Sequence, residues 1–211
     1  MQHRGNEHWY TLRRRILGVF EKLLGIKTVA LRSEGQVNHK WHQDFILHLV
    51  SIMRPANYLE VGIYRCGLFN RILPFASKLT GIDLSPESGK FMVSSPKAKF
   101  VCSDSVSYAK RLKEAGETFD FIFIDADHSE QAVQGDFSHY VELLRPHGLI
   151  LLHDTHPIDD LATSQARCGD GYLAIDRFSR QTDVWEIMTI PLHPGLTLCR
   201  KRKTQLSWQE K

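Results

Sequence analysis

Residues 57–83 read NYLEVGIYRCGLFNRILPFASKLTGID, and this stretch decides the fold. It begins with a short apolar run at 58–61 and ends with a second one at 78–82. The segment between them, 67–77, has the length of a helix. Because two short apolar runs joined by a helix form a βαβ unit, the stretch predicts two neighbouring parallel strands.

The same alternation of strands and helices continues along the chain. Further strands are expected at 99–102, 119–124 and 149–152. Further helices are expected at 86–94, 105–115, 129–144 and 172–180. Two last runs, 184–190 and 196–200, flank a turn rich in Pro and Gly that suits a hairpin. The pattern predicts an α/β domain whose mixed sheet is parallel except for this pair and carries helices on both faces.

Every predicted parallel strand delivers an acid at its carboxyl end. The acids are Glu60, Asp83, Asp104, Asp125 and Asp154. In open α/β sheets these strand ends meet at one edge, and ligands bind there. Clustered carboxylates repel one another, so a ligand or a cation that uses them explains the pattern better than a purely structural role.

The turn after the first strand differs from that of a dinucleotide-binding protein. Gly62 and Gly67 bracket the turn, where glycine allows a sharp bend and close approach to a ligand. Tyr64 occupies the position of the second glycine in the G-x-G-x-x-G fingerprint, which disfavours NAD. Asp83 follows about 20 residues later, where an acid can bind ribose hydroxyls. It also suits the N-terminus of the next helix, and the two roles are compatible.

Five motifs in this order carry a family resemblance. They are LEVGIYRCG (59–67), GIDLSP (81–86), CSDS (102–105), FIFIDADHS (121–129) and LLRPHGLILLHDT (143–155). The series resembles the class I S-adenosylmethionine-dependent methyltransferases. The IDADH and HDT segments are similar to those of metal-dependent O-methyltransferases of the catechol, caffeoyl-CoA and macrocin-type sugar groups. The resemblance implies a Rossmann-like, seven-stranded mixed sheet in the order 3-2-1-4-5-7-6.

The resemblance also implies S-adenosylmethionine as the cofactor. Glu60, Gly62 and Gly67 would line its methionine part, and Asp83 would bind its ribose. Asp104 and Ser105 would lie beside the adenine. The complete set of expected cofactor-binding residues is Glu60, Gly62, Ile63, Tyr64, Gly67, Asp83, Leu84, Ser103, Asp104, Ser105, Asp125 and His128.

The resemblance further implies a metal site and a base. Asp125 and Asp154 match metal ligands, and Thr155 falls where many relatives carry Asn or Asp as a further ligand. His153 falls where some relatives carry Glu, so the third ligand and the metal itself stay open. Bound Mg²⁺ would lower the pKa of an acceptor hydroxyl. His128 takes the place of the lysine base of catechol-type enzymes, so Asp125 and His128 are the expected catalytic residues, although His128 also suits the start of a helix.

These residues predict methylation of a hydroxyl on a small molecule, with a sugar as one candidate acceptor. Thr155 leaves open the alternative of a non-catalytic methyltransferase-like binding protein. The acids retained at the strand ends argue against loss of the active site. An NAD-dependent oxidoreductase is disfavoured because no Tyr-x-x-x-Lys pair occurs, since Tyr172 is followed by Asp176. A nucleic-acid methylase is disfavoured because no Asn-Pro-Pro-Tyr-type signature occurs.

Composition is that of an ordinary globular protein. The 211 residues are 42% hydrophobic and 24% charged, with a net charge of +3. The basic clusters at 13–15 and 200–203 are expected to be solvated chain ends, and no nucleic-acid partner is expected. Four cysteines without a CxxC pair predict reduced thiols and no zinc site. With no signal peptide and no apolar run long enough to span a bilayer, we expect a soluble, cytoplasmic protein, and a homo-oligomer stays open.

Three parts of the chain are distinguished by their patterns. Residues 1–54 are expected to form a helical extension, with helices at 7–24 and 37–53. Residues 55–203 form the expected methyltransferase domain, and 204–211 a tail. Acceptor specificity is expected to lie in the N-terminal helices and in the polar loop 155–171, which is long for a connection inside a domain.

Overall fold

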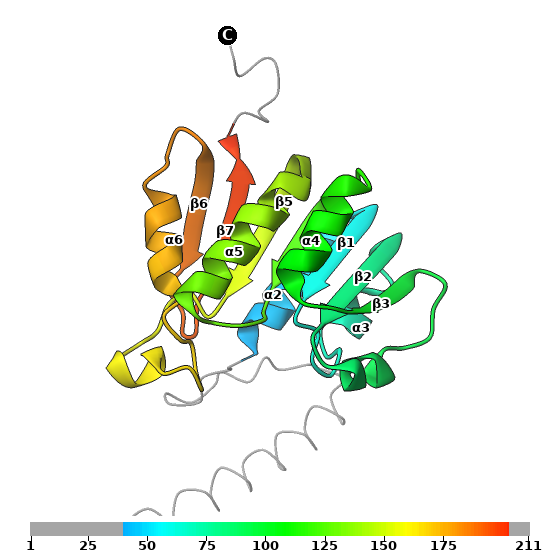
Figure 1. Ribbon diagram of the computed structural model, residues 1–211, viewed down its shortest axis with the longest axis horizontal. Coiled ribbons are helices and arrows are strands. Elements are labelled where there is room, and N and C mark those ends of the chain that lie inside the picture. Colours follow the sequence, from blue (N-terminus) through cyan, green and yellow to red (C-terminus); the bar gives the residue numbers. More distant parts are fainter. Residues whose placement is uncertain (1–39, 203–211) are drawn as a thin grey trace, which may run out of the picture. The chain divides into compact units, whose positions relative to one another are not determined.

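A computed structural model describes residues 40–202, and a seven-stranded sheet is their central element (Figure 1). The strand order β3-β2-β1-β4-β5-β7-β6 confirms the predicted fold. The strands are β1 (Asn57–Val61), β2 (Lys78–Asp83), β3 (Ala98–Cys102), β4 (Phe119–Ile124), β5 (Leu144–His153), β6 (Trp185–Ile190) and β7 (Leu196–Lys201). Strands β1 to β5 run parallel, and β7 pairs antiparallel with both β5 and β6.

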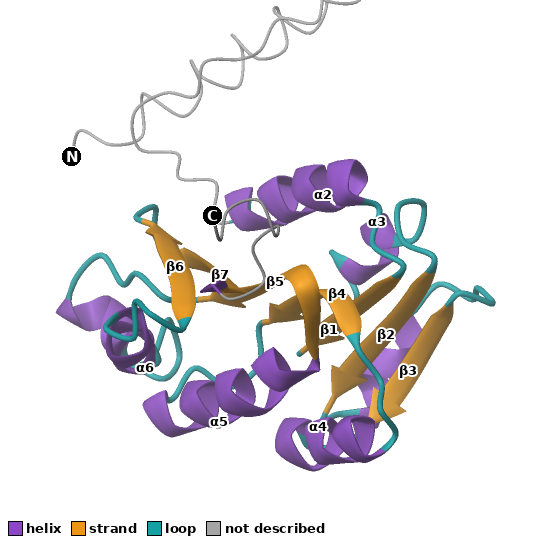
Figure 2. Cartoon of the chain, turned by 90° about the horizontal axis from the view of Figure 1, so that it is seen from above, coloured by secondary structure: helices purple, strands orange, loops and turns teal. Residues whose placement is uncertain are grey.

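Helices cover both faces of the sheet, as expected (Figure 2). One face carries α2 (Trp41–Met53) and α3 (Phe69–Ile72), while α4 (Ser105–Glu114), α5 (Glu130–Tyr140) and α6 (Tyr172–Ser179) lie on the other. Strand β4 is buried along most of its length and contributes side chains to the core on both faces of the sheet. Phe121 and Phe123 pack toward α2 and α3, whereas Ile122 and Ile124 pack toward α4 and α5. This two-sided burial explains why its sequence is an unbroken apolar run.

Two predicted helices have a different form in the structure. The segment 67–77 contains only the one-turn helix α3, because two left-handed residues precede it and Pro74 follows it. The segment 86–94 forms a 3-10 helix, η1 (Pro86–Phe91). Strand β5 also begins at Leu144, five residues earlier than expected at 149. The expectations at 105–115, 129–144 and 172–180 are confirmed as helices, the second ending in the short helix η2 (Val141–Leu143).

Helix α2 belongs to the packed part of the molecule. Its side chains Ile46 and Val50 are fully buried in the core beneath β1 and β4. The helix ends at Arg54, which adopts a left-handed conformation immediately before Pro55. The predicted helix 7–24 and the tail 204–211 lie outside the described residues, so the proposed three-part division stays a prediction. Within residues 40–202, no helix has the length and apolar character to cross a bilayer.

Candidate functional site

Gly62 brings three strand ends together at the carboxyl edge of the sheet. Its φ of 87° is left-handed, and an added Cβ would lie 2.1 Å from the backbone oxygen of Asp125. Its N–H donates to the carbonyl of Ile82 at 2.8 Å. Glycine is therefore required here, because a side chain would push β1 away from the end of β4.

The remainder of the turn does not depend on glycine in the expected way. Tyr64 and Cys66 adopt left-handed conformations, with φ of 45° and 54°. Gly67 is not left-handed, so of the two glycines expected to allow the bend only Gly62 adopts a left-handed conformation. An added Cβ at Gly67 would meet no atom within 4 Å. Gly67 therefore borders open space, which is compatible with a neighbouring ligand.

Asp83, at the end of β2, is held by backbone groups. One carboxylate oxygen accepts from the Tyr64 N–H at 2.8 Å, and the other accepts from the Ser85 N–H at 2.9 Å. The neighbouring side chain of Leu84 is 75% exposed. A carboxylate has about four acceptor positions, so Asp83 keeps acceptor capacity toward the open edge.

Glu60 and Ile63 lie beneath the turn rather than on it. Glu60 is buried and accepts a hydrogen bond from the Tyr58 hydroxyl at 2.6 Å. Burial raises the pKa of Glu60 to about 8, although the Tyr58 hydrogen bond opposes this shift. Ile63 is buried against Gly81. Cofactor contacts of these two residues stay predictions.

The residues after β3 organise the start of α4. Asp104 caps the helix by accepting from the Ser107 N–H at 2.8 Å. The hydroxyl of Ser105 donates to the buried Asp136, and that of Ser103 accepts from Arg111 at 2.9 Å. These polar side chains therefore have structural partners, and their expected position beside an adenine stays a prediction.

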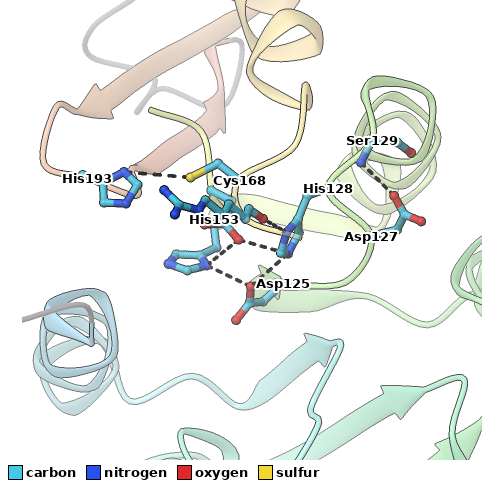
Figure 3. Close-up of polar contacts among 9 residues, drawn as sticks. Asp125, Asp127, His128, Ser129, His153, Cys168 and His193 are labelled. Carbon is cyan, nitrogen blue, oxygen red and sulfur yellow. Dashed lines mark hydrogen bonds and ion pairs between the residues drawn. The ribbon is translucent and has the colours of Figure 1, made fainter. Parts of the chain in front are cut away.

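The ends of β4 and β5 form a histidine–aspartate cluster made of His42, Asp125, His128, His153 and Asp154. His128 Nε2 lies 3.0 Å from Asp154 Oδ2 and 3.8 Å from Asp125 Oδ1. His153 Nδ1 lies 2.9 Å from Asp125 Oδ1 and 3.3 Å from Asp154 Oδ2. Figure 3 shows Asp125, His128 and His153 pointing toward one another. The predicted catalytic pair and both predicted acidic metal ligands thus lie in one cluster.

The carboxylates and imidazoles of the cluster stabilise one another's charged forms. Burial alone would raise the pKa of Asp125 and Asp154, but the imidazoles hold that of Asp125 well below its usual range and lower that of Asp154 to about 2. Burial opposes charging of His128, yet hydrogen bonds to the two carboxylates raise its pKa to about 10. Burial likewise opposes charging of His153, but the charge of Asp125 raises its pKa to about 9. Carboxylates and imidazoles compensate one another here.

Both ring nitrogens of His128 face oxygen acceptors. Nδ1 lies 2.8 Å from the carbonyl oxygen of Arg167, and Nε2 faces the two carboxylates. In this arrangement the ring carries a proton on each nitrogen. His128 therefore offers no lone pair until something other than a proton neutralises the carboxylates.

Thr155 has its own partner in the hairpin. Its hydroxyl is hydrogen-bonded to that of Thr197 at 2.8 Å, and Thr197 also contacts Thr189 at 2.7 Å. Thr155 is buried, so this contact joins the end of β5 to β6 and β7. Its role as a metal ligand stays a prediction.

Sequence reasoning missed His42 as a member of the cluster. Its ring lies against that of His153, with the centroids 3.8 Å apart. Helix α2 also carries His48, and nothing in the helical pattern separates one histidine from the other. Only the packing of α2 on the sheet shows that His42 is buried while His48 is exposed.

Three segments join beside the cluster, and we call them the three-segment wall: the start of α2, loop 155–171 and turn 191–195. The indole N–H of Trp41 donates to the carbonyl of His193 at 3.0 Å. The His156 N–H donates to the carbonyl of Pro194 at 2.8 Å, and Cys168 Sγ lies 3.9 Å from His193 Nδ1. The wall also exposes the apolar side chains Ile158, Leu161 and Leu192.

Similarity to known proteins agrees with this geometry. Residues 59–155 match the family described as "Methyltransferase domain". No curated protein sequence matches the chain.

Solved structures share the fold at low sequence identity. An O-methyltransferase from Bacillus cereus in complex with SAH is 17% identical, with a TM-score of 0.63 and coverage of 90% of each chain. A putative caffeoyl-CoA O-methyltransferase from Staphylococcus aureus is 14% identical, with a TM-score of 0.63 and coverage of 92% of this chain and 98% of that one. The N-methyltransferase NodS from Bradyrhizobium japonicum, bound to S-adenosyl-L-homocysteine (SAH), is 14% identical, with a TM-score of 0.56 and coverage of 83% and 94%.

The strand order, the strand-end acids and the family match support one assignment. The expected class I architecture is confirmed, and the similar structures include both O- and N-methyltransferases. Residues 59–155 match the methyltransferase domain family, and the chain has the class I methyltransferase fold.

Proposed function

We propose that this chain is an S-adenosylmethionine-dependent methyltransferase that acts on a hydroxyl of a small molecule. The observation that carries the proposal is the presence of two unlike sites on one sheet edge. Asp83 is an oriented carboxylate beside the Gly62 turn, and the histidine–aspartate cluster lies at the ends of the adjoining strands. SAH in the B. cereus enzyme and in NodS supports the choice of cofactor.

The residues around the turn fit the cofactor. Asp83 can accept hydrogen bonds from ribose hydroxyls while it keeps the Tyr64 and Ser85 amides. The exposed side chain of Leu84 offers apolar surface next to it, and Gly67 borders open space. S-adenosylmethionine, when bound, supplies an electrophilic methyl group. The protein contributes orientation and removes a proton from the acceptor.

The carboxylates of the cluster fit a divalent cation. Asp125 would hold it, with Asp154 and Thr155 as the further ligands expected from the sequence, and it would lower the pKa of the acceptor hydroxyl. His128 is the proposed proton acceptor. Its Nε2 faces Asp125 and Asp154, which retain its proton, so this role depends on what else neutralises those carboxylates.

Calorimetric titration with S-adenosylmethionine and with NAD tests the cofactor assignment. Wild type should bind S-adenosylmethionine and not NAD. Asp83→Ala should lose about 1.5–3 kcal/mol of binding free energy, or roughly 10- to 150-fold in affinity. Asp127→Ala is the matched control, because Asp127 also accepts from a backbone N–H, that of Ser129, at 2.7 Å. Equal affinity of Asp83→Ala and wild type would show that the ribose assignment is wrong.

A screen of sugars, phenols and amines with methyl-labelled cofactor tests the reaction. Labelled product should form with hydroxyl acceptors, and transfer to amines alone would contradict the proposal. Chelation with EDTA should lower the rate, and His128→Ala should lower it by about 100-fold or more. Full activity after chelation would exclude the cation, and an unimpaired His128→Ala enzyme would exclude the base. Binding of S-adenosylmethionine without transfer to any acceptor would favour the non-catalytic alternative.

A further inference from the structure

We propose that His42, Asp125 and His153 form a nitrogen-rich site for a first-row transition metal ion of the Zn²⁺ type, rather than for Mg²⁺. This inference rests on the proposed function for the role of the cation and specifies which cation it is. It differs from the sequence expectation because two imidazoles, one of them from α2, replace Asp154 and Thr155 as direct ligands. The lack of paired cysteines does not exclude it, since no donor in this set is a thiol.

The three donors come from three separate elements. His42 lies in the first turn of α2, Asp125 follows β4, and His153 ends β5. Each offers one ligand atom, and the three atoms lie within 4.8 Å of one another. Donors bound to one ion at about 2.0–2.2 Å are separated by roughly 3–4.4 Å. Only small side-chain movements are therefore needed to close the set on an ion.

An independent observation at His153 also indicates a ligand. Its Nε2 is buried and has no hydrogen-bond partner among the described residues, while the side chain is only 9% exposed. A buried polar atom without a partner is costly, and an ion would satisfy it. The other nitrogen, Nδ1, faces Asp125 and Asp154. With Asp125 turned to the ion, Asp154 would remain on this nitrogen, 3.3 Å away. A carboxylate on the far nitrogen is the usual arrangement that orients a metal-binding histidine.

Helix α2 fixes the second imidazole in place. His42 is 4% exposed, and the fully buried Ile46 on the next turn anchors the helix against the sheet. The contact between the His42 and His153 rings therefore belongs to the packed core and not to a mobile loop. Two imidazoles held side by side form a preorganised pair of nitrogen donors.

The donor chemistry decides between ions. Mg²⁺ prefers oxygen ligands and retains waters, whereas imidazole suits Zn²⁺ and its first-row neighbours. Two histidines and one carboxylate also leave a coordination position open, as in catalytic zinc sites. In this arrangement Asp154 is a positioning residue that contacts His153 Nδ1 and His128 Nε2.

Metal binding tests the site without an activity assay. Chelator-treated full-length chain is dialysed against Zn²⁺, Co²⁺ or Mg²⁺, and the bound metal is quantified. Wild type should bind one Zn²⁺ or Co²⁺ per chain and retain Mg²⁺ at least tenfold more weakly. Bound Co²⁺ should also give a visible absorption band that reports nitrogen ligation. Wild-type protein that prefers Mg²⁺, or binds none of these ions, would overturn the inference, and neither result requires a variant.

Variants identify the ligand from α2. His42→Ala should weaken Zn²⁺ and Co²⁺ binding by roughly 100-fold. His48→Ala is the matched control, because His48 lies on the same helix and is exposed, and it should bind as wild type does. Equal metal affinities of the two variants would overturn the role of His42. Thermal melting and S-adenosylmethionine calorimetry on both variants show whether the domain is intact. Loss of metal binding with retained cofactor binding separates this inference from the proposed function.

Discussion

The two acidic sites along the sheet edge hold their charges in different ways. Asp83, at the end of β2, receives two backbone N–H groups and has no charged partner in contact among the described residues. Asp125 and Asp154, at the ends of β4 and β5, are held instead by the imidazoles of His128 and His153. The first site is therefore held by backbone groups, and the second by titratable side chains.

The two sites should therefore respond differently to a change in pH. The groups that hold Asp83 are backbone amides, which do not titrate. The imidazoles have raised pKa values, so their stabilising contribution is complete below pH 6.5 and is lost as the pH rises through about 9 to 10. One edge of the sheet thus carries a carboxylate held by backbone groups and a cluster held by titratable imidazoles.

The largest expected effect is the loss of Asp154. Asp154→Ala should lower the free energy of unfolding by about 3–5 kcal/mol, because it leaves the two imidazoles of His128 and His153 with the single carboxylate of Asp125. Asp83→Ala should cost only about 1 kcal/mol, because its exposed amide partners can turn to water. Urea denaturation at pH 7 measures both. Equal losses would contradict the distinction between the two sites.

A variant of Glu60, beneath the Gly62 turn, tests how stability on this side of the sheet edge depends on pH. Because its pKa is raised from 4.5 to about 8 in the fold, its stabilising contribution is complete below pH 4.5 and lost as the pH rises through 8. Glu60→Gln keeps an acceptor for the Tyr58 hydroxyl and should remove this loss, which amounts to several kcal/mol. Unfolding of wild type and variant is compared from pH 4 to pH 9. The exposed Glu114→Gln serves as control, and parallel curves for all three proteins would refute the shift.

Gly62 and Gly67 lie in the same turn, and replacing each with alanine separates an effect on packing from an effect on ligand binding. Gly62→Ala should cost about 2–3 kcal/mol, because it adds left-handed strain and a clash with the Asp125 backbone. Gly67→Ala should change stability by less than about 0.5 kcal/mol, because no atom lies near its added Cβ. Any loss of cofactor affinity in Gly67→Ala would then come from the ligand itself. A destabilised Gly67→Ala would show that the space is filled.

A smaller loss than that of Gly62→Ala is expected at the cap of α4. Asp104→Ala should lower the unfolding free energy by about 1 kcal/mol, because the Ser107 N–H loses its partner. Asp104→Asn keeps a capping oxygen and should remain close to wild type in stability. Cofactor calorimetry on the Asn variant then tests the expected adenine neighbour separately. Unchanged affinity would leave Asp104 with a structural role alone.

The sheet could be predicted from the sequence because its signals are local. Apolar runs such as 119–124 identify the strands, and the motif series implied their order. The same reasoning placed Asp125 and Asp154 at neighbouring strand ends, where they contact the same imidazoles. Parallel strands bring their carboxyl ends to one edge whatever their separation in the chain.

The missed features depend on packing that no local pattern encodes. His42 and His48 occupy similar positions in sequence, and only the docking of α2 buries the first. The hydroxyl of Thr155 faces Thr197, which belongs to a strand more than 40 positions later. Tyr64 is left-handed although its residue type normally avoids this conformation, so no sequence pattern marks its part in the bend.

The hydrogen bonds of the three-segment wall have a consequence for how this protein could be redesigned. Trp41 and His193 are 152 positions apart, yet they join the start of α2 to the turn before β7. His156 ties loop 155–171 to the same turn. None of these residues belongs to the Gly62–Asp83 side of the sheet edge. On the proposed function, a graft meant to change the substrate should carry all three segments together, because one segment alone would lack the partners that hold it.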